Sequence, residues 1–277
     1  MDRPLLRVLV SVILPVICIG AAAQSLQPSY LGFDRNDYPG DASLPVLRQT
    51  FSYTGYWLNN PPGEKSNSWV GKRTVVQNAG FGFLVLFNGR LDAQLQRNAA
   101  ALGRSDGQQA IAAAKREGFP ARTIIFLDLE EGGRMLPEQK AYIYAWVDAV
   151  NRAGFRAGVY CSGIPVKEYK NTTINTADDI RDNARGRDIT FWVTQDSCPP
   201  SPGCVFPKQP PSPSASKLEY AEVWQFVQSP KRPEFAAKCG GYNPSDGKCY
   251  PPGVAPSTHL HVDVNTATSN DPSHGRL

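Results

Sequence analysis

Short apolar runs, each long enough for one strand, recur along the chain and constrain its fold more than any other feature. Most are nearly continuous, which is typical of strands buried on both faces of a parallel sheet. The segments lie at residues 30–34, 52–57, 82–87, 123–128, 156–161, 188–193, 221–226 and 260–264. With helical segments between several of them, they predict an α/β protein, specifically a (β/α)8 TIM-type barrel. A doubly wound open sheet is the alternative, but the sequence has no G-x-G-x-x-G after the first strand and no P-loop.

Two helices have clear end signals. Ser105 or Asp106 can cap a helix that stops at Gly118, and Pro137 suits the first turn of another that stops at Gly154. The segments that follow, GFPARTIIFLD and GFRAGVYCS, resemble each other as successive αβ units would. Further helices are predicted at 41–50, 65–79 and 175–186, and a Pro/Cys-rich loop between strands six and seven at 199–216.

The start of the chain has the composition of a signal peptide. Basic residues precede an apolar stretch at 8–20, and three alanines at 21–23 offer a small-residue cleavage site. A membrane anchor is the alternative, but the apolar stretch is short for a spanning helix. We therefore expect residues 1–23 to be removed and residues 24–277 to form one secreted domain, extracellular or periplasmic, with no membrane association.

Five of the six cysteines follow the predicted cleavage site. Cys198 and Cys204 bracket a Pro-rich loop, and Cys239 and Cys249 bracket a loop rich in Gly, Asn and Pro. Export favours a disulfide within each pair. A metal site is the alternative, but no histidine lies near these pairs and neither has C-x-x-C spacing. Cys161 ends an apolar run and is predicted to be a buried free thiol.

Acidic residues stand at the ends of several predicted strands. Asp34 ends the first, Asp128 and Glu130 end the fourth, and Asp263 ends the eighth. In such barrels the strand ends meet at one mouth, and the first and eighth strands are neighbours. Because strand side chains alternate, Asp128 and Glu130 share a face and Glu131 points elsewhere. Single aspartates often only cap helices, but four carboxyl groups at one mouth repel one another and indicate a functional site.

Aromatic and amide side chains lie near the same strand ends. They are Tyr56, Trp192, Trp224, Gln225 and Asn265. Aromatic faces can stack on sugar rings, and amides and carboxylates can hydrogen-bond sugar hydroxyls. Each aromatic residue alone would more often belong to the core than to a binding surface. Together they predict a carbohydrate-binding groove.

Other chemistries have less support in the sequence. The net charge is +4 and the basic residues are scattered, so no nucleic-acid partner is expected. His259 and His261 form an H-x-H pair that could bind a metal with help from carboxylates, but no third histidine lies on another predicted strand. The segment YCSG is not a G-x-S-x-G nucleophile elbow. We therefore expect neither a metal nor a cofactor.

Four segments in the same order and spacing resemble motifs of glycoside hydrolase family 25 lysozymes. They are LGFDRNDYPG, IIFLDLEEGG, VWQF and HVDVNTA, and the similar region covers roughly residues 30–268. The chain looks closer still to a bacterial glycoside-hydrolase-like family, formerly a domain of unknown function and a barrel relative of those lysozymes. The resemblance implies that Glu130 is the general acid, that Asp128 and Asp263 flank the cleaved bond, and that Asp34 lies at the base of the site. The chain departs from the family where the Pro/Cys-rich loop replaces a helix.

These observations predict a secreted glycoside hydrolase that acts on peptidoglycan or a related amino-sugar polysaccharide. Glycosidic cleavage needs a protonated acid and a second carboxylate, with environments that separate their pKa values. We expect Glu130 to hold the proton and Asp128, lower on the strand, to stay ionised. The alternative is a non-catalytic barrel that binds cell-wall carbohydrate. In either case the expected partner is the wall polysaccharide and the expected state is a monomer.

Overall fold

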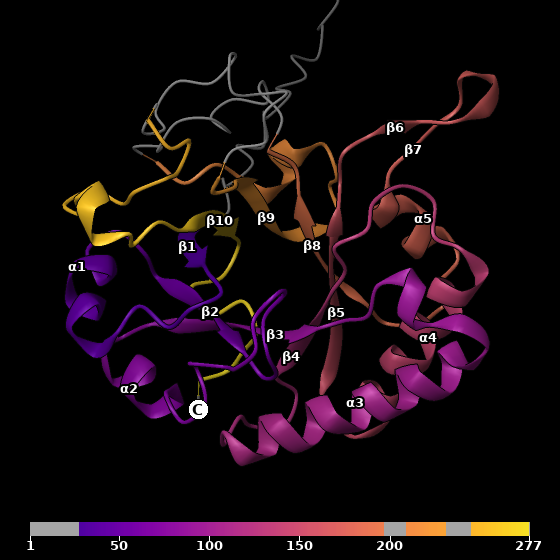
Figure 1. The fold of residues 1–277 in the computed structure, drawn as a ribbon, viewed down its shortest axis with the longest axis horizontal. Coiled ribbons are helices and arrows are strands. Elements are labelled where there is room, and N and C mark those ends of the chain that lie inside the picture. Colours follow the sequence, from indigo (N-terminus) through magenta and orange to yellow (C-terminus); the bar gives the residue numbers. More distant parts are fainter. Residues whose placement is uncertain (1–27, 197–208, 231–244, 277) are drawn as a thin grey trace, which may run out of the picture.

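The computed structural model describes residues 28–196, 209–230 and 245–276. At its centre is a closed barrel of eight strands in the spatial order β1-β10-β9-β8-β5-β4-β3-β2 (Figure 1). The strands are β1 (Tyr30–Asp34), β2 (Tyr53–Trp57), β3 (Gly82–Asn88), β4 (Ile124–Asp128), β5 (Arg156–Ser162), β8 (Thr190–Thr194), β9 (Ala221–Val227) and β10 (Asp263–Ala267). The predicted α/β barrel is therefore confirmed, and each predicted strand overlaps an observed one.

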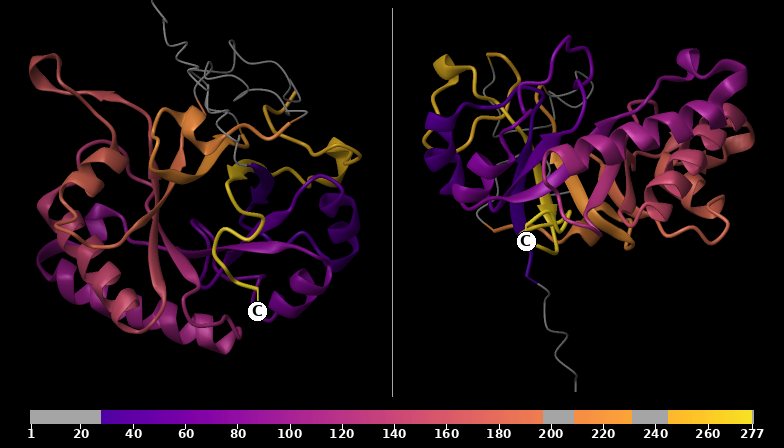
Figure 2. Two further views of the ribbon diagram at one scale, coloured as in Figure 1. Left: turned by 180° about the vertical axis from the view of Figure 1, so that it is seen from behind. Right: turned by 90° about the horizontal axis from the view of Figure 1, so that it is seen from below.

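Helices lie around the outside of the barrel (Figures 1 and 2). They are α1 (Leu44–Arg48), α2 (Arg73–Asn78), α3 (Ala99–Arg116), α4 (Pro137–Arg152) and α5 (Thr176–Asp182). The predicted start of α4 is right, but α3 begins several residues before the predicted cap at Ser105 or Asp106. Asp106 is instead buried within α3, where it accepts hydrogen bonds from Arg90 and the Tyr142 hydroxyl. Its carboxyl group thus joins α3 to α4 rather than capping a helix.

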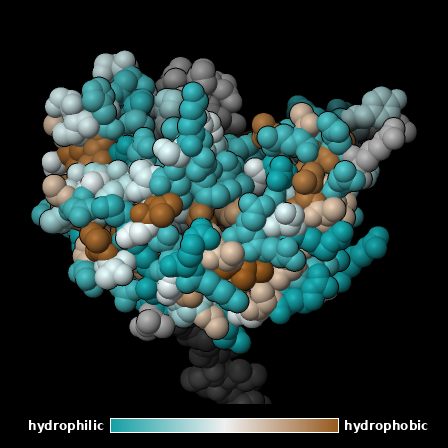
Figure 3. All heavy atoms as spheres, turned by 60° about the horizontal axis from the view of Figure 1, so that its bottom comes forward, coloured by the Kyte–Doolittle hydropathy of each residue, from teal (hydrophilic) through white to brown (hydrophobic). Residues whose placement is uncertain are grey.

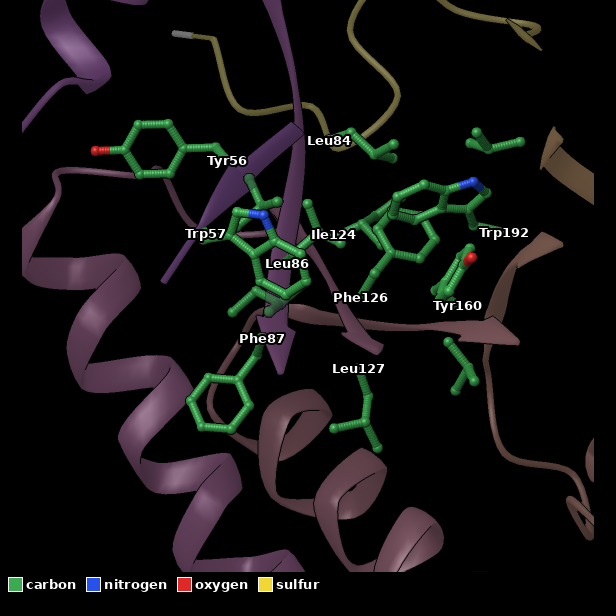
Figure 4. Close-up of a cluster of buried hydrophobic side chains, with 14 of the residues drawn as sticks. Tyr56, Trp57, Leu84, Leu86, Phe87, Ile124, Phe126, Leu127, Tyr160 and Trp192 are labelled. Atoms are coloured by element: carbon green, nitrogen blue, oxygen red, sulfur yellow. The ribbon is translucent and has the colours of Figure 1, made fainter. Parts of the chain in front are cut away.

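Side chains of the strands alternate between the barrel interior and the layer beneath the helices. Figure 4 shows Phe87 and Leu127 directed toward the helices, whereas Phe126 lies beside Tyr160 and Trp192. The interior is filled by these rings, and burying a side chain of this kind stabilises the fold by about 1.5–3 kcal/mol.

A glycine on β5 makes room for one of the interior rings. A Cβ atom at Gly158 would lie 2.5 Å from the ring of Phe126. A larger residue at this position would therefore force Phe126, and with it the packed interior, to move.

The last strand runs in the direction opposite to the prediction. β10 pairs antiparallel with both β9 and β1, whereas the other neighbouring barrel strands pair in parallel. An antiparallel strand needs no helical crossover, and the short turn η6 (Pro256–Thr258) is the only helical element between β9 and β10 in the part of the chain described. Asp263 consequently begins β10 instead of ending a parallel strand. It lies opposite Asp34 in the register, so it still reaches the predicted mouth.

A small hairpin projects from the barrel wall between β5 and α5 (Figure 1). It is formed by β6 (Val166–Lys167) and β7 (Thr173–Ile174), with the exposed Tyr169 near its tip. On the face drawn in Figure 3, apolar side chains are scattered in small groups among hydrophilic ones. Within the described ranges, no helix has the length and apolar character needed to cross a bilayer.

Several predictions concern residues outside the described ranges. The signal peptide lies there, as do Cys198, Cys204 and Cys239, so both disulfides stay predictions. Cys161 is a buried free thiol, as predicted, and burial raises its pKa. Cys249 is also buried and free among the described residues. Of the predicted Pro/Cys-rich loop, the described part contains the short turn η5 (Pro213–Ser216), which precedes β9.

Candidate active site

Three of the predicted site residues meet at the base of the barrel mouth. Asp34, which is 8% exposed at the end of β1, accepts hydrogen bonds through Oδ1 from Gln225 Nε2 at 3.0 Å and Asn265 Nδ2 at 2.6 Å. The oxygen atom of each amide group also accepts a hydrogen bond, which fixes the orientation of the amide. The Tyr160 hydroxyl donates to Gln225 Oε1 at 2.8 Å, and Trp192 Nε1 donates to Asn265 Oδ1 at 2.9 Å. Strands β1, β5, β8, β9 and β10 thus fix one buried polar network around the Asp34 carboxyl group.

The environment of Asp34 raises its pKa to about 6. Burial is the largest cause, the hydrogen bonds from Asn265 and Gln225 oppose it, and the charge of Glu130 adds a smaller increase. Gly55 on β2 provides the space for this carboxyl group, since a Cβ atom there would lie 2.7 Å from the Cβ of Asp34. Asp34 therefore loses its proton near neutral pH, with two amides ready to stabilise the charge.

Asp128 ends β4 and has a different environment. It is 2% exposed, and no N–H or hydroxyl group of the described residues donates to either carboxyl oxygen. Burial raises the pKa of Asp128 well above its ordinary value, and the charges of Glu130 and Asp34 raise it further. Burial thus favours the protonated form of Asp128. This corrects the expectation that polar neighbours keep it ionised.

Glu130 follows Asp128 on the same face and is exposed at the mouth. Partial desolvation raises the pKa of Glu130, and the neighbouring Asp128 carboxyl group opposes part of that rise. The two carboxyl groups therefore lie close enough to affect each other's pKa, and both pKa values are raised. Such a pair titrates as a unit rather than as two independent acids.

Glu131 is separated from this pair. Its Oε2 accepts hydrogen bonds from the Asp92 backbone N–H at 2.8 Å and from Gln139 Nε2 on α4 at 2.8 Å. The side chain joins the loop after β3 to the start of α4. Its role is structural, and it lies away from the face that Asp128 and Glu130 share.

Asp263 begins β10 and is half-buried beside Asp34. Its Oδ1 accepts a hydrogen bond from the Ser229 backbone N–H at 2.5 Å, and its Oδ2 a long one from Gln225 Nε2 at 3.4 Å. Burial and then the charge of Asp34 raise the pKa of Asp263 well above its ordinary value, against the effect of the Ser229 N–H. Asp34 and Asp263 thus form a second carboxyl pair.

A further acidic residue at this mouth was missed in the sequence. Asp196 is fully buried just after β8, and its charge contributes to the raised pKa of Asp263. The signal was available, because Asp196 follows the apolar run at 188–193 much as Asp128 and Glu130 follow theirs.

The four predicted carboxyl groups gather around one hydroxyl group. Burial raises the pKa of Tyr160 well above 10, and the charges of Glu130, Asp128, Asp34 and Asp263 all raise it further. Charges act in this way only over short distances, so all four groups lie at the same end of the barrel.

Two neighbouring pockets open at this end. One, of about 300 Å³, is lined by Asp34 and Asp263, and the other, of about 380 Å³, by Asp128 and Glu130. The loop after β2 borders both, because Glu64 lines the first pocket and residues 62–63 line the second. The carboxyl groups therefore occupy one mouth that this loop divides into two parts.

The prediction that three aromatic residues form sugar-stacking surfaces is wrong. Tyr56 is fully buried, its hydroxyl donates to Glu117 at the end of α3, and Figure 4 shows its ring on the side away from Trp192. Trp224 is fully buried and donates to the backbone oxygen of Gln195. Trp192 lies inside the barrel, but it is covered and serves to orient Asn265. None of the three exposes a ring face at the mouth.

The wrong prediction for Tyr56 arises because the sequence does not show which side chains of β2 face the barrel interior. Side chains alternate, so Trp57, directly after Tyr56, points to the interior instead. Its Nε1 donates to the backbone oxygen of Arg35 at 3.1 Å, next to Asp34. The sequence placed an aromatic residue near the strand end correctly, but it did not determine which of the two neighbours faces inward.

Comparisons with known proteins agree with this fold. Residues 55–209, more than half of the chain, match the model of the Rv2525c-like, glycoside hydrolase-like domain. No curated protein sequence matches the chain.

Solved structures resemble the chain at low sequence identity. An uncharacterized protein of B. stearothermophilus is 20% identical with a TM-score of 0.53, over 86% of this chain and 95% of its own. The Mycobacterium tuberculosis Tat-secreted protein Rv2525c, solved with L-tartrate, is 14% identical with a TM-score of 0.50, over 86% and 94%. The Clostridium perfringens spore cortex lytic enzyme SleM is 13% identical with a TM-score of 0.51, over 87% and 68%. The structures share the fold, and the family match shows that the chain belongs to the Rv2525c-like, glycoside hydrolase-like domain family.

Proposed function

We propose that the protein is a glycoside hydrolase that cleaves peptidoglycan or a related amino-sugar polysaccharide. The family is described as glycoside hydrolase-like, and a spore cortex lytic enzyme has the same fold. The observation that carries the proposal is the Asp128–Glu130 pair, in which a buried carboxyl group with a raised pKa lies beside an exposed one at a pocket. Such a pair keeps a proton available at neutral pH beside a pocket.

In this proposal Glu130 is the general acid. Cleavage requires a carboxylic acid that protonates the leaving glycosidic oxygen. Glu130 is the exposed member of its pair and lines a pocket of about 380 Å³, so a sugar oxygen can approach it. Asp128 is 2% exposed at the wall of the same pocket. In this proposal the raised pKa of Glu130 keeps its side chain protonated until Glu130 donates its proton to the leaving oxygen.

The Asp34–Asp263 pair supplies the negative charge. The sugar ring develops positive charge at its anomeric carbon in the transition state, and a nearby carboxylate stabilises it. Above about pH 6 the pair carries charge, and Asn265 and Gln225 favour that charge on Asp34. In this proposal the Asp128–Glu130 pair at the end of β4 supplies the proton. The Asp34–Asp263 pair on β1 and β10 supplies the negative charge.

A carbohydrate-binding barrel without turnover is the second candidate. It is favoured by the burial of both Asp34 and Asp128, which limits direct contact of these two groups with substrate. In that case the mouth recognises the polymer and no bond is broken.

One experiment separates the two candidates. The mature protein is incubated with purified peptidoglycan, and both released reducing ends and protein bound to the insoluble wall are measured. The hydrolase proposal predicts release by the wild type and binding without release by Glu130→Gln. Wild-type binding without release identifies the binding barrel, and neither binding nor release refutes both.

We further propose that the protein acts outside the cytoplasm. The support is the leader-like sequence at 1–23 and the description of its M. tuberculosis structural relative as Tat-secreted. Secreted protein should have its N-terminus near Gln24 by mass spectrometry. Non-reducing peptide mapping of the same sample should show Cys198 linked to Cys204 and Cys239 to Cys249, and intact Met1 or a link to Cys161 would contradict these assignments.

A further inference from the structure

The pocket of the Asp34–Asp263 pair also contains an unpaired cation. Arg35 follows Asp34 and lines this pocket, and its Nε and Nη1 are buried without a hydrogen-bond partner in the described part of the chain. The ion pairs formed by the described residues do not include Arg35. Buried polar groups are nearly always paired, and leaving one unpaired costs about 1–3 kcal/mol. A guanidinium group in this state therefore calls for an explanation beyond folding.

The neighbouring carboxyl groups of the described residues form no ion pair with Arg35, although Asp34, Asp37, Glu64 and Asp263 line the same pocket and the charge of Asp37 acts on the guanidinium group. The Asp34 carboxyl accepts from amides on β9 and β10, and the Asp263 carboxyl accepts from the Ser229 backbone N–H. The backbone oxygen of Arg35 accepts from Trp57 Nε1, which fixes the chain at this point. Arginine stays protonated in proteins. The guanidinium group is thus a charged donor on the pocket wall.

Two further basic residues lie close to Arg35. His261 lines the same pocket, and its Nδ1 is buried without a partner among the described residues. Lys248 Nζ lies 3.4 Å from His261 Nε2. Burial and then the charges of Lys248 and Arg35 lower the pKa of His261, so both charges lie near its ring. The pocket is therefore lined by basic as well as carboxyl groups, and Arg35 and His261 both have buried nitrogen atoms directed at no partner of the described chain.

We propose that the basic part of this pocket, formed by Arg35 and His261, binds the carboxylate of an acidic sugar unit in the wall glycan. The inference rests on the proposed function, because it assumes that the mouth binds glycan. A sugar acid matches the pocket, since its hydroxyl groups can donate to Asp34 and Asp263 while its carboxylate accepts from the guanidinium group. Guanidinium and carboxylate groups form strong, charge-assisted hydrogen bonds. Arg35 is then a specificity residue for the acidic unit.

Two disaccharides that differ in one acidic group test the proposal. One joins N-acetylglucosamine to N-acetylmuramic acid, whose lactyl group carries a carboxylate, and the other contains N-acetylglucosamine alone. Affinities are measured by calorimetry in the Glu130→Gln background, with Arg35→Gln as the test variant. Arg104→Gln is the control, because Arg104 is exposed on α3 outside the pocket. A third ligand, with a peptide on the lactyl group, distinguishes a lactyl carboxylate from a peptide carboxylate.

We expect Arg35→Gln to weaken binding of the acidic disaccharide about 10- to 100-fold, the usual effect of losing a hydrogen bond to a charged group. Binding of the neutral disaccharide should change less than about twofold, and Arg104→Gln should change neither. The variant should be as thermally stable as its parent or more so, because the bond from Trp57 is to the backbone and an unpaired charge is removed. Equal loss for both disaccharides, or no loss for the acidic one, overturns the inference. If the parent binds neither disaccharide, the proposed function fails as well.

Discussion

The two carboxyl pairs of the mouth differ although both are built on barrel strands at the same end. Asp34 and Asp128 are both at least 90% buried, yet two amides donate to Asp34 and no described N–H or hydroxyl group donates to Asp128. The pKa of Asp34 accordingly rises only to about 6, whereas that of Asp128 rises well above its ordinary value. Donors to the charged form, more than depth of burial, decide which carboxyl group carries charge.

The direction of β10 explains why hydrogen-bond donors reach the Asp34–Asp263 pair and not Asp128. The antiparallel strand places Asn265 and Asp263 next to β1, and β9 adds Gln225. In the parallel part, Asp128 lies in register between Asn88 and Tyr160. Asn88 donates to the backbone oxygen of Asn60 instead, and Tyr160 donates to Gln225. The side of the barrel that contains the antiparallel strand thus stabilises a negative charge on Asp34. The parallel side favours the protonated form of Asp128.

The largest expected effect comes from removing the proton of the Asp128–Glu130 pair. Glu130→Gln keeps the shape of the side chain but cannot donate a proton, so wall digestion should fall about 100- to 10,000-fold while wall binding persists. The matched control is Glu131→Gln. Both hydrogen bonds to Glu131 go to one oxygen, which the amide oxygen can replace, so this variant should retain activity. Full activity of Glu130→Gln would rule out the assigned acid.

A second prediction concerns the pH dependence of stability. The folded pKa of Asp34 is about 6, above its ordinary 3.8, so the folded state binds the proton more tightly than the unfolded state. The free energy of unfolding should therefore fall as pH rises from about 4 to 6, by up to roughly 3 kcal/mol. Urea titrations at several pH values measure this slope. This decrease is the contribution of Asp34 alone, and the raised pKa values of Asp128, Glu130 and Asp263 add slopes of the same sign. Asp34→Asn should therefore make the slope shallower by the share of Asp34, and an unchanged slope in this variant would contradict the raised pKa of Asp34.

A third prediction concerns the amide donors to the charged pair. Gln225→Leu leaves the Tyr160 hydroxyl without its acceptor and removes one donor from Asp34. Stability should fall by about 1–3 kcal/mol. The acid limb of the pH–activity profile should also move to higher pH, because the pKa of Asp34 rises when a donor is lost. A stability loss with an unmoved acid limb would mean that Asp34 does not set that limb.

The smallest effect is expected at Tyr56, outside the mouth. Tyr56→Phe removes the hydrogen bond to Glu117 and should cost about 1 kcal/mol of stability. Wall binding and digestion should be unchanged, because the ring lies beneath the helices. A loss of wall binding without a loss of stability would show that Tyr56 belongs to the binding site.

The fold and the positions of the carboxyl groups could be predicted because they depend on local pattern. Apolar runs mark buried strands, and acidic residues after them mark strand ends, so Asp34, Asp128, Glu130 and Asp263 were all found. The direction of β10 could not be predicted in this way. An apolar run has the same sequence pattern in a parallel and an antiparallel strand. Asp263 therefore lies at the mouth as the first residue of β10, not as the last residue of a parallel strand.

The aromatic residues and the protonation states depend on non-local contacts. Whether Tyr56 or Trp57 faces inward follows from the register of β2 with its neighbours, which the sequence does not display. The charge of Asp128 depends on the absence of donors from β3 and β5 rather than on its own neighbours in the chain. Sequence pattern therefore located the candidate site, while tertiary packing determined which of its groups hold protons.

The unequal protonation of Asp34 and Asp128 is the central claim, and carboxyl ¹³C NMR tests it most directly. Aspartate-labelled mature protein is titrated from pH 4 to pH 8, with the two signals assigned through Asp34→Asn and Asp128→Asn. We predict that Asp34 titrates near pH 6 and that Asp128 is still protonated at pH 7. An Asp128 signal that titrates near pH 4 would contradict the account, because β4 would then hold no stored proton.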